Sequence, residues 1–87
     1  MGDTTVSDED LMHRVQLHHD EEAFGELFNR YRRRITSYIY RLVGNAASAE
    51  SLAQDAFYRV LKNAHRYQYP RRFSTWFYTI ARNLCID

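Results

Sequence analysis

Apolar residues recur every three or four positions in four segments of the chain, a spacing that predicts amphipathic helices. We expect helices over residues 7–17, 20–44, 48–64 and 73–87, each with one apolar side turned inward. The third segment is rich in alanine on that side, so a neighbouring helix can approach it closely. The positions predicted to form the core are Leu11, Met12, Val15, Phe24, Leu27, Phe28, Tyr31, Ile35, Tyr38, Ile39, Leu42, Ala49, Leu52, Ala53, Ala56, Phe57, Val60, Leu61, Ala64, Phe73, Trp76, Phe77, Ile80, Ala81 and Leu84.

The ends of these segments carry the side chains that helix ends require. Ser7 and Asp10 have the spacing of a capping box, and Asp20 is a second N-cap candidate. Gly44-Asn45 is a typical helix end, and Ser48 is then the N-cap candidate of the third helix.

Residues 65–72 break the helical pattern and contain Pro70, the only proline. We interpret them as an ordered or semi-ordered loop between the last two helices. The fourth helix is still in phase at Asp87 and has no stop signal, so we expect the chain to be cut within a helix.

Length and composition agree with one small helical domain. The chain has 87 residues, and its 3 glycines and 1 proline are too few for the many reversals of a β-sandwich or barrel. A single cysteine, Cys85, excludes an internal disulfide framework, and no apolar run approaches the length of a membrane span. We therefore predict an all-α fold in the reducing cytoplasm: a compact bundle of about four helices with an ordered loop between the last two, and no membrane insertion.

The net charge of +1 hides a strong asymmetry along the chain. Residues 1–26 carry eight of the 11 acids and one base, whereas residues 27–87 carry three acids and eleven bases. Aromatic residues are concentrated in residues 67–78. Basic and aromatic residues interleaved in one short stretch favour binding to single-stranded nucleic acid, because stacking and phosphate attraction act together.

Catalytic and metal-binding patterns are absent from the sequence. There is no phosphate-cradling glycine loop and no recognisable Ser/His/Asp arrangement, so we predict that the domain is not an enzyme and has no cofactor. His13, His18 and His19 lack the i, i+4 spacing of two ligands on one helix face, and we predict no metal site. Cys85 fits a small buried or half-buried residue.

Three surface features each have two interpretations. The cluster of Arg30 and residues 32–34 is either a solvated face or a phosphate-binding surface. Tyr67 and Tyr69 lie in the loop, where the pattern requires no burial, whereas the aromatics of the fourth helix fit a core better than a platform for bases. Asp55 stands on an otherwise basic body, where it can pair with Arg59 in its own helix or with an arginine of a partner protein.

The runs at residues 49–60 (AESLAQDAFYRV) and 73–87 (FSTWFYTIARNLCID) resemble two helices of bacterial sigma factors. The first resembles the helix that binds core RNA polymerase, and the second resembles the helix that melts the promoter. The eight-residue loop between them and the run at residues 23–31 (AFGELFNRY) are similar to those of the extracytoplasmic-function (ECF) group. The resemblance implies a region 2 domain over residues 8–87, after an N-terminal tail at residues 1–7, with the C-terminal domain that reads the −35 element absent from this chain.

The resemblance also implies partners and site residues. The partners are the clamp helices of the polymerase β′ subunit, the single-stranded non-template strand of the −10 element, and an anti-sigma factor. One base of that strand would enter a pocket between the loop and the last helix, where Tyr67 and Asn83 match the family's pocket residues. The polymerase-binding residues implied are Leu52, Gln54, Asp55, Tyr58 and Arg59. The DNA-binding residues implied are Arg66, Tyr67, Tyr69, Arg71, Arg72, Thr75, Thr79, Arg82 and Asn83.

Two other classes of protein share part of this pattern. A pure protein-interaction module would show the same amphipathic helices, but it has no use for Tyr67, Tyr69 and two arginines beside an aromatic helix. A helix-turn-helix reader of duplex DNA needs a tighter turn than an eight-residue loop with Pro70.

Overall fold

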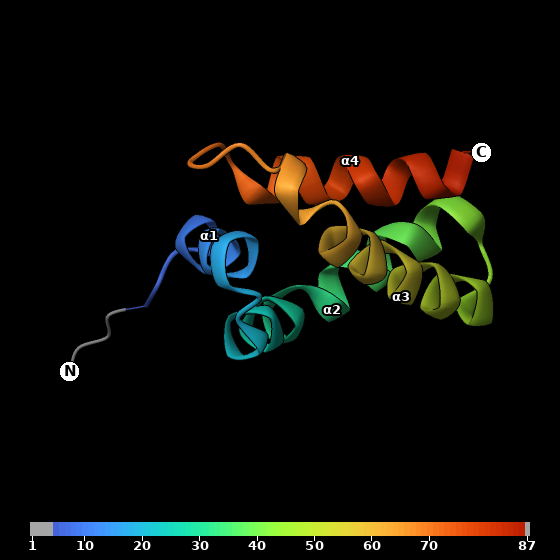
Figure 1. Cartoon of the computed structure of the whole chain (residues 1–87). Coiled ribbons are helices and arrows are strands. Elements are labelled where there is room, and N and C mark those ends of the chain that lie inside the picture. Colours follow the sequence, from blue (N-terminus) through green and yellow to red (C-terminus); the bar gives the residue numbers. More distant parts are fainter. Residues whose placement is uncertain (1–4, 87) are drawn as a thin grey trace.

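The computed structural model describes residues 5–86, which form four α-helices and one short 3₁₀-helix. The elements are α1 (Asp8–His18), α2 (Glu21–Val43), α3 (Ala46–Lys62), η1 (Ala64–Arg66) and α4 (Phe73–Ile86). Helices α2, α3 and α4 pack against one another along their lengths, and α1 lies at the end of the bundle where the loop before α4 projects (Figure 1). The described residues contain no strand, so the predicted all-α fold and four-helix bundle are confirmed.

The helix ends follow the sequence signals, with one correction. Ser7 and Asp20 cap α1 and α2 through hydrogen bonds from the backbone N–H groups three residues on, and Gly44 ends α2 in the left-handed conformation at φ 73°. Helix α3 begins at Ala46 rather than at Ser48, which we predicted as its N-cap. Asn45 takes that role, because its side chain accepts a hydrogen bond from the Ser48 N–H at 2.8 Å.

The core lies where one stripe of each helix meets the others. The side chains that are fully shielded from solvent come from all four helices, as predicted, and the buried face of α3 is made largely of small residues. The buried core residues are Leu11, Met12, Val15, Ala23, Leu27, Tyr31, Ile35, Ile39, Ala49, Ala53, Ala56, Phe57, Val60, Tyr67, Phe73, Phe77 and Ala81.

Some predicted core positions lie at the margin of the bundle. Leu42 and Leu61 are each 48% exposed and Phe28 is 36% exposed, since the apolar stripes are wider than the surfaces that neighbouring helices cover. Trp76 is half-buried and packs against the core at its edge, whereas Phe73 and Phe77 on the same helix are buried.

The first helix joins the bundle through polar contacts as well as apolar ones. Asp8 accepts hydrogen bonds from Arg30 and from the Tyr31 hydroxyl of α2, and it forms an ion pair with Arg30 at 2.8 Å. Burial and the hydrogen bond to Asp8 raise the pKa of Tyr31 above its ordinary value. Of the predicted N-terminal tail, residues 1–4 lie outside the described part of the chain, and Val6 packs against the core.

No helix within residues 5–86 combines the length and the apolar character needed to cross a membrane.

Candidate nucleic-acid interface

A pocket of about 470 Å³ opens where the loop before α4 meets the first two turns of that helix. Its volume falls in the range of roughly 300–1,000 Å³ that is typical of small-molecule sites. The pocket is lined by Arg66, Tyr67, Gln68, Arg71, Arg72, Thr75, Trp76 and Thr79. The loop and α4 therefore bring together six of the nine residues that the resemblance assigned to DNA.

The chemistry of the lining suits an anionic ligand with a flat apolar part. Three exposed arginines and no acid line the pocket, and Tyr67 and Trp76 supply aromatic surface. The Thr79 hydroxyl donates a hydrogen bond to the Thr75 carbonyl oxygen at 2.8 Å, which leaves its oxygen free to accept one. Cations around an aromatic wall match a nucleotide, whose phosphate is charged and whose base stacks.

Tyr67 is part of the core, although the sequence pattern of the loop required no burial for it. It is only 3% exposed, and its ring packs on Trp76 and Phe73 at centroid distances of 5.3 and 6.4 Å. Its hydroxyl donates a hydrogen bond to the Arg71 carbonyl oxygen, and burial raises the pKa of Tyr67 to about 12. A loop can contribute to a core when its polar atoms are satisfied locally, and this one folds back over its own tyrosine.

The other predicted DNA-binding residues lie outside the pocket lining. Tyr69 turns toward α1: its hydroxyl donates a hydrogen bond to Asp10 at 2.7 Å, and its ring stacks on His13 at 4.0 Å. Arg82 and Asn83 are exposed on α4, one turn beyond Thr79 and on the side of the helix that Thr79 occupies. They extend the surface of the pocket along the helix.

The predicted polymerase-binding residues lie on both sides of α3. Gln54 lines a cleft of about 590 Å³ between α2 and α3, and Asp55, Tyr58 and Arg59 line a second cleft of about 410 Å³ that reaches Leu84 of α4. Leu52 is half-buried and packs against the core. The exposed face of α3 is thus a ridge between two clefts, and the four exposed residues do not share one pocket.

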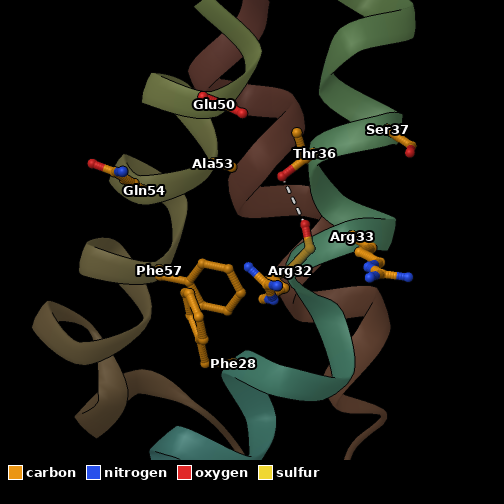
Figure 2. A pocket seen from close by; sticks show the side chains of 9 residues that line it. All are labelled: Phe28, Arg32, Arg33, Thr36, Ser37, Glu50, Ala53, Gln54 and Phe57. Carbon is orange, nitrogen blue, oxygen red and sulfur yellow. Dashed lines mark hydrogen bonds between the residues drawn. The ribbon is translucent and has the colours of Figure 1, made fainter. Parts of the chain in front are cut away.

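The α2–α3 cleft has an aromatic floor and basic sides. Phe28 and Phe57 pack at a centroid distance of 4.8 Å, and Arg32 of α2 lies beside Phe57, whereas Glu50 lies farther along α3 (Figure 2). Arg33 also lines this cleft. The sequence did not identify these residues as a group, because side chains of α2 and α3 line one cleft only once the two helices pack together.

The arginine cluster of α2 divides among different environments. Arg30 is held by Asp8 and by Glu26 at 3.0 Å, and the hydrogen bond that it donates to Asp8 is the main cause of its raised pKa. Arg34 lies over the Tyr31 ring at 4.9 Å. Residues 5–86 contain no ion pair between Asp55 and Arg59, so the Asp55 carboxylate is not paired within its own helix.

Within the described residues, no three side chains of His, Cys, Asp or Glu come together in a way that could hold a metal ion. Cys85 is half-buried, and burial raises the pKa of its thiol, which keeps it in the less reactive protonated form.

Comparison with known proteins gives a consistent result across sequence and structure. The profile of the family described as Sigma-70 region 2 matches residues 27–87. The chain is 43% identical over 68 residues to the ECF RNA polymerase sigma factor SigW of Bacillus subtilis, covering 78% of this chain and 36% of that protein. It is 39% identical over 79 residues to the ECF RNA polymerase sigma factor BldN of Streptomyces coelicolor, covering 90% of this chain and 30% of that protein. The chain thus spans about a third of the length of these two relatives.

A solved structure shares the whole fold. It is the NMR structure of an engineered region 2 of sigmaE in complex with GTAAAA, and it superimposes with a TM-score of 0.87. The match covers 97% of this chain and 86% of that one, at 31% sequence identity.

Proposed function

Because this chain belongs to the sigma-70 region 2 family and is the region 2 domain of an ECF sigma factor, we propose that it acts in transcription initiation. It binds core RNA polymerase through α3 and the adjoining clefts, and it recognises the promoter −10 element by capturing the non-template strand as the promoter melts. The domain makes and breaks no covalent bond in this role. Its partner polymerase places the activity in the cytoplasm.

The observation that carries the DNA-binding part is the pocket between the loop and α4. A captured base leaves its stack, which costs a few kcal/mol, and a pocket that stacks on the base and hydrogen-bonds its edge offsets that cost. The half-buried Trp76 supplies aromatic surface there, and the Gln68 amide is the polar group best suited to a base edge. The solved relative was studied in complex with a six-nucleotide strand, which supports this assignment.

The arginines and the pocket have separate tasks in this proposal. Arg71 and Arg72 attract phosphates of any sequence, whereas the pocket and Asn83 discriminate among bases. Because Tyr67 is buried, it shapes the pocket wall from behind and offers little surface of its own. This assigns the direct base contacts to the more exposed lining residues and to Asn83.

The experiment that tests DNA recognition compares labelled single-stranded hexamers, starting from GTAAAA and a randomised pool, by fluorescence anisotropy. Arg71→Ala and Arg72→Ala should weaken binding to all strands alike and reduce the salt dependence by about one released counterion each. Asn83→Ala and Gln68→Ala remove hydrogen bonds to base edges, so they should lower the preference for the best-bound hexamer by about 1–3 kcal/mol while leaving the salt dependence unchanged. A wild-type chain that binds all hexamers equally, both alone and in reconstituted holoenzyme on a pre-melted promoter, would exclude the proposed role.

The polymerase-binding part rests on the exposed ridge of α3. Asp55 is exposed and has no ion-pair partner within the described residues, so Asp55→Arg should leave the fold intact and reverse one charge of the docking surface. We expect the variant to lose retention on immobilised β′ clamp helices. Glu22→Arg reverses an exposed charge on α2, outside both clefts, and serves as the control. Equal retention of the two variants would remove α3 from the interface.

A further inference from the structure

One polar face of α1 contacts the loop that shapes the pocket, from the loop's beginning to its end. Glu9, His13 and Gln16 follow one another at spacings of four and three residues, which places them on the same side of the helix. Asp10 lies beside them. The apolar residues of α1 point into the core on another side, so this polar face has a separate task.

Gln16 and Glu9 fix the two ends of the loop. The Gln16 amide nitrogen donates hydrogen bonds to the carbonyl oxygens of Ala64 at 3.0 Å and Tyr67 at 2.5 Å. At the other end, a Glu9 carboxylate oxygen accepts a hydrogen bond from the Phe73 N–H at 2.7 Å. Phe73 is the first residue of α4, so a side chain 64 residues away supplies the N-terminal cap of that helix.

Asp10 and His13 fix the middle of the loop. The Tyr69 hydroxyl donates to Asp10 at 2.7 Å, and this hydrogen bond raises the pKa of Tyr69. The His13 ring lies nearly parallel to the Tyr69 ring, with 17° between the planes. Few hydrogen bonds lie within the loop itself. The Arg71 N–H donates to the Gln68 carbonyl oxygen at 2.8 Å, and the Tyr67 hydroxyl donates to the Arg71 carbonyl oxygen.

We propose that the polar face of α1, formed by Glu9, Asp10, His13 and Gln16, holds the loop in the conformation that reads the −10 strand. None of these four residues lines the pocket, so they are positioning residues that act through the loop backbone. A loop that is already ordered loses less conformational entropy when it binds, and its polar groups are placed before the base arrives. The inference rests on the proposed function of the pocket, and it gives the acidic N-terminal segment a role in selectivity that acts through the loop.

The test combines two measurements on the same variants. The first is amide hydrogen exchange of residues 64–73 in the chain without DNA, and the second is the ratio of affinities for the best-bound hexamer and for a randomised hexamer pool. Glu9→Ala and Gln16→Ala remove contacts at the two ends of the loop. Glu9→Gln keeps an acceptor oxygen for the Phe73 N–H, and Glu22→Ala removes an exposed acid from the first turn of α2 as a control.

We expect Glu9→Ala and Gln16→Ala to speed exchange at Phe73 and Tyr67 and to lower the affinity ratio by about threefold to tenfold, as the loss of one cap or hydrogen bond implies. Affinity for the pool should change by less than about twofold, since the arginines remain. Glu9→Gln and Glu22→Ala should behave like the wild type in both measurements.

Different results would exclude the role of α1 and the role of the pocket. Faster loop exchange with an unchanged affinity ratio would overturn the inference and leave the pocket's role intact. If the wild type shows no preference among hexamers, the proposed function fails, and the exchange data still decide whether α1 holds the loop. Unchanged exchange in both Glu9→Ala and Gln16→Ala would overturn the inference on its own.

Discussion

The hydroxyl of Tyr67 is the most informative single atom to remove, because it separates the loop's packing from its closure. In Tyr67→Phe the ring stays in its place, which is 3% exposed, and only the hydrogen bond to the Arg71 carbonyl oxygen is lost. The net contribution of one intramolecular hydrogen bond to the free energy of unfolding is about 0.5–1.5 kcal/mol. Arg71 is exposed, so water can reach its carbonyl oxygen, and we expect a loss near the middle of that range, about 1 kcal/mol.

The measurement is thermal unfolding followed by circular dichroism. In a domain of this size, about 1 kcal/mol corresponds to a decrease in Tm of about 4–8 °C. Tyr67→Ala removes the buried ring as well and should cost about 3–5 kcal/mol, a large part of the stability of a small domain. Tyr58→Phe is the matched control, because Tyr58 is 63% exposed and its hydroxyl forms no hydrogen bond within residues 5–86; the Tm of this variant should equal that of the wild type.

Two outcomes would refute this reasoning. If Tyr67→Phe and Tyr58→Phe melt at the same temperature, the hydrogen bond does not close the loop in solution. If Tyr67→Ala retains the stability of the wild type, the ring is not part of the core, and Tyr67 becomes available as a direct stacking residue for DNA. Loss of DNA binding in Tyr67→Ala is evidence for a direct contact with DNA only when it is measured below the melting temperature of that variant.

Three further results are expected. Phe77→Ala should cost about 3–5 kcal/mol in urea unfolding, and Trp76→Ala should cost less, because Phe77 is fully buried and Trp76 is half-buried; equal losses would contradict this order. Gly25→Ala should raise Tm, since the helix gains about 0.5–1 kcal/mol and the new methyl group meets no atom within 4 Å, whereas Gly44→Ala should lower it, because φ is 73° there. The pKa of Tyr67, raised to about 12, predicts that its contribution to stability is complete below about pH 10 and is lost as the pH rises toward 12; urea midpoints in Tyr67→Phe should fall less over that range.

At the start of α3 and in the loop before α4, the local sequence pattern was not sufficient to predict the structure. Gly44-Asn45 has the sequence of a helix end, and it is one, but Asn45 also begins the next helix by capping it. When only two residues connect two helices, one of them can follow the first helix and also cap the second. An analysis that considers one helix at a time assigns such a residue to only one of these roles. The burial of Tyr67 could not be predicted for a related reason: the loop has no periodicity, so nothing in its sequence indicates which side chains turn inward.

The candidate site was predictable in its parts. Residues 66, 67, 71, 72, 75 and 79 were all assigned to DNA from the resemblance, and the fold gathers them around one pocket. Gln68 and Trp76 were missed as lining residues, the first because a lone glutamine carries no signal, the second because its helical phase indicated a core position. The spacing of Glu9, His13 and Gln16 marks a polar face of α1, but it does not identify the segment that this face contacts.

The sequence by itself determined the helices, their caps at Ser7, Asp20 and Gly44, and the separation of acidic from basic segments, because these depend on residues within a few positions of one another. Only the tertiary structure decided that α1 meets the loop and that Glu9 caps α4. Those contacts join residues that are 48 to 64 positions apart, and their formation depends on how the whole core packs. A helix and its caps depend on interactions within one or two turns of the chain. Which segment the polar face of α1 contacts depends instead on how all the helices between α1 and the loop pack together.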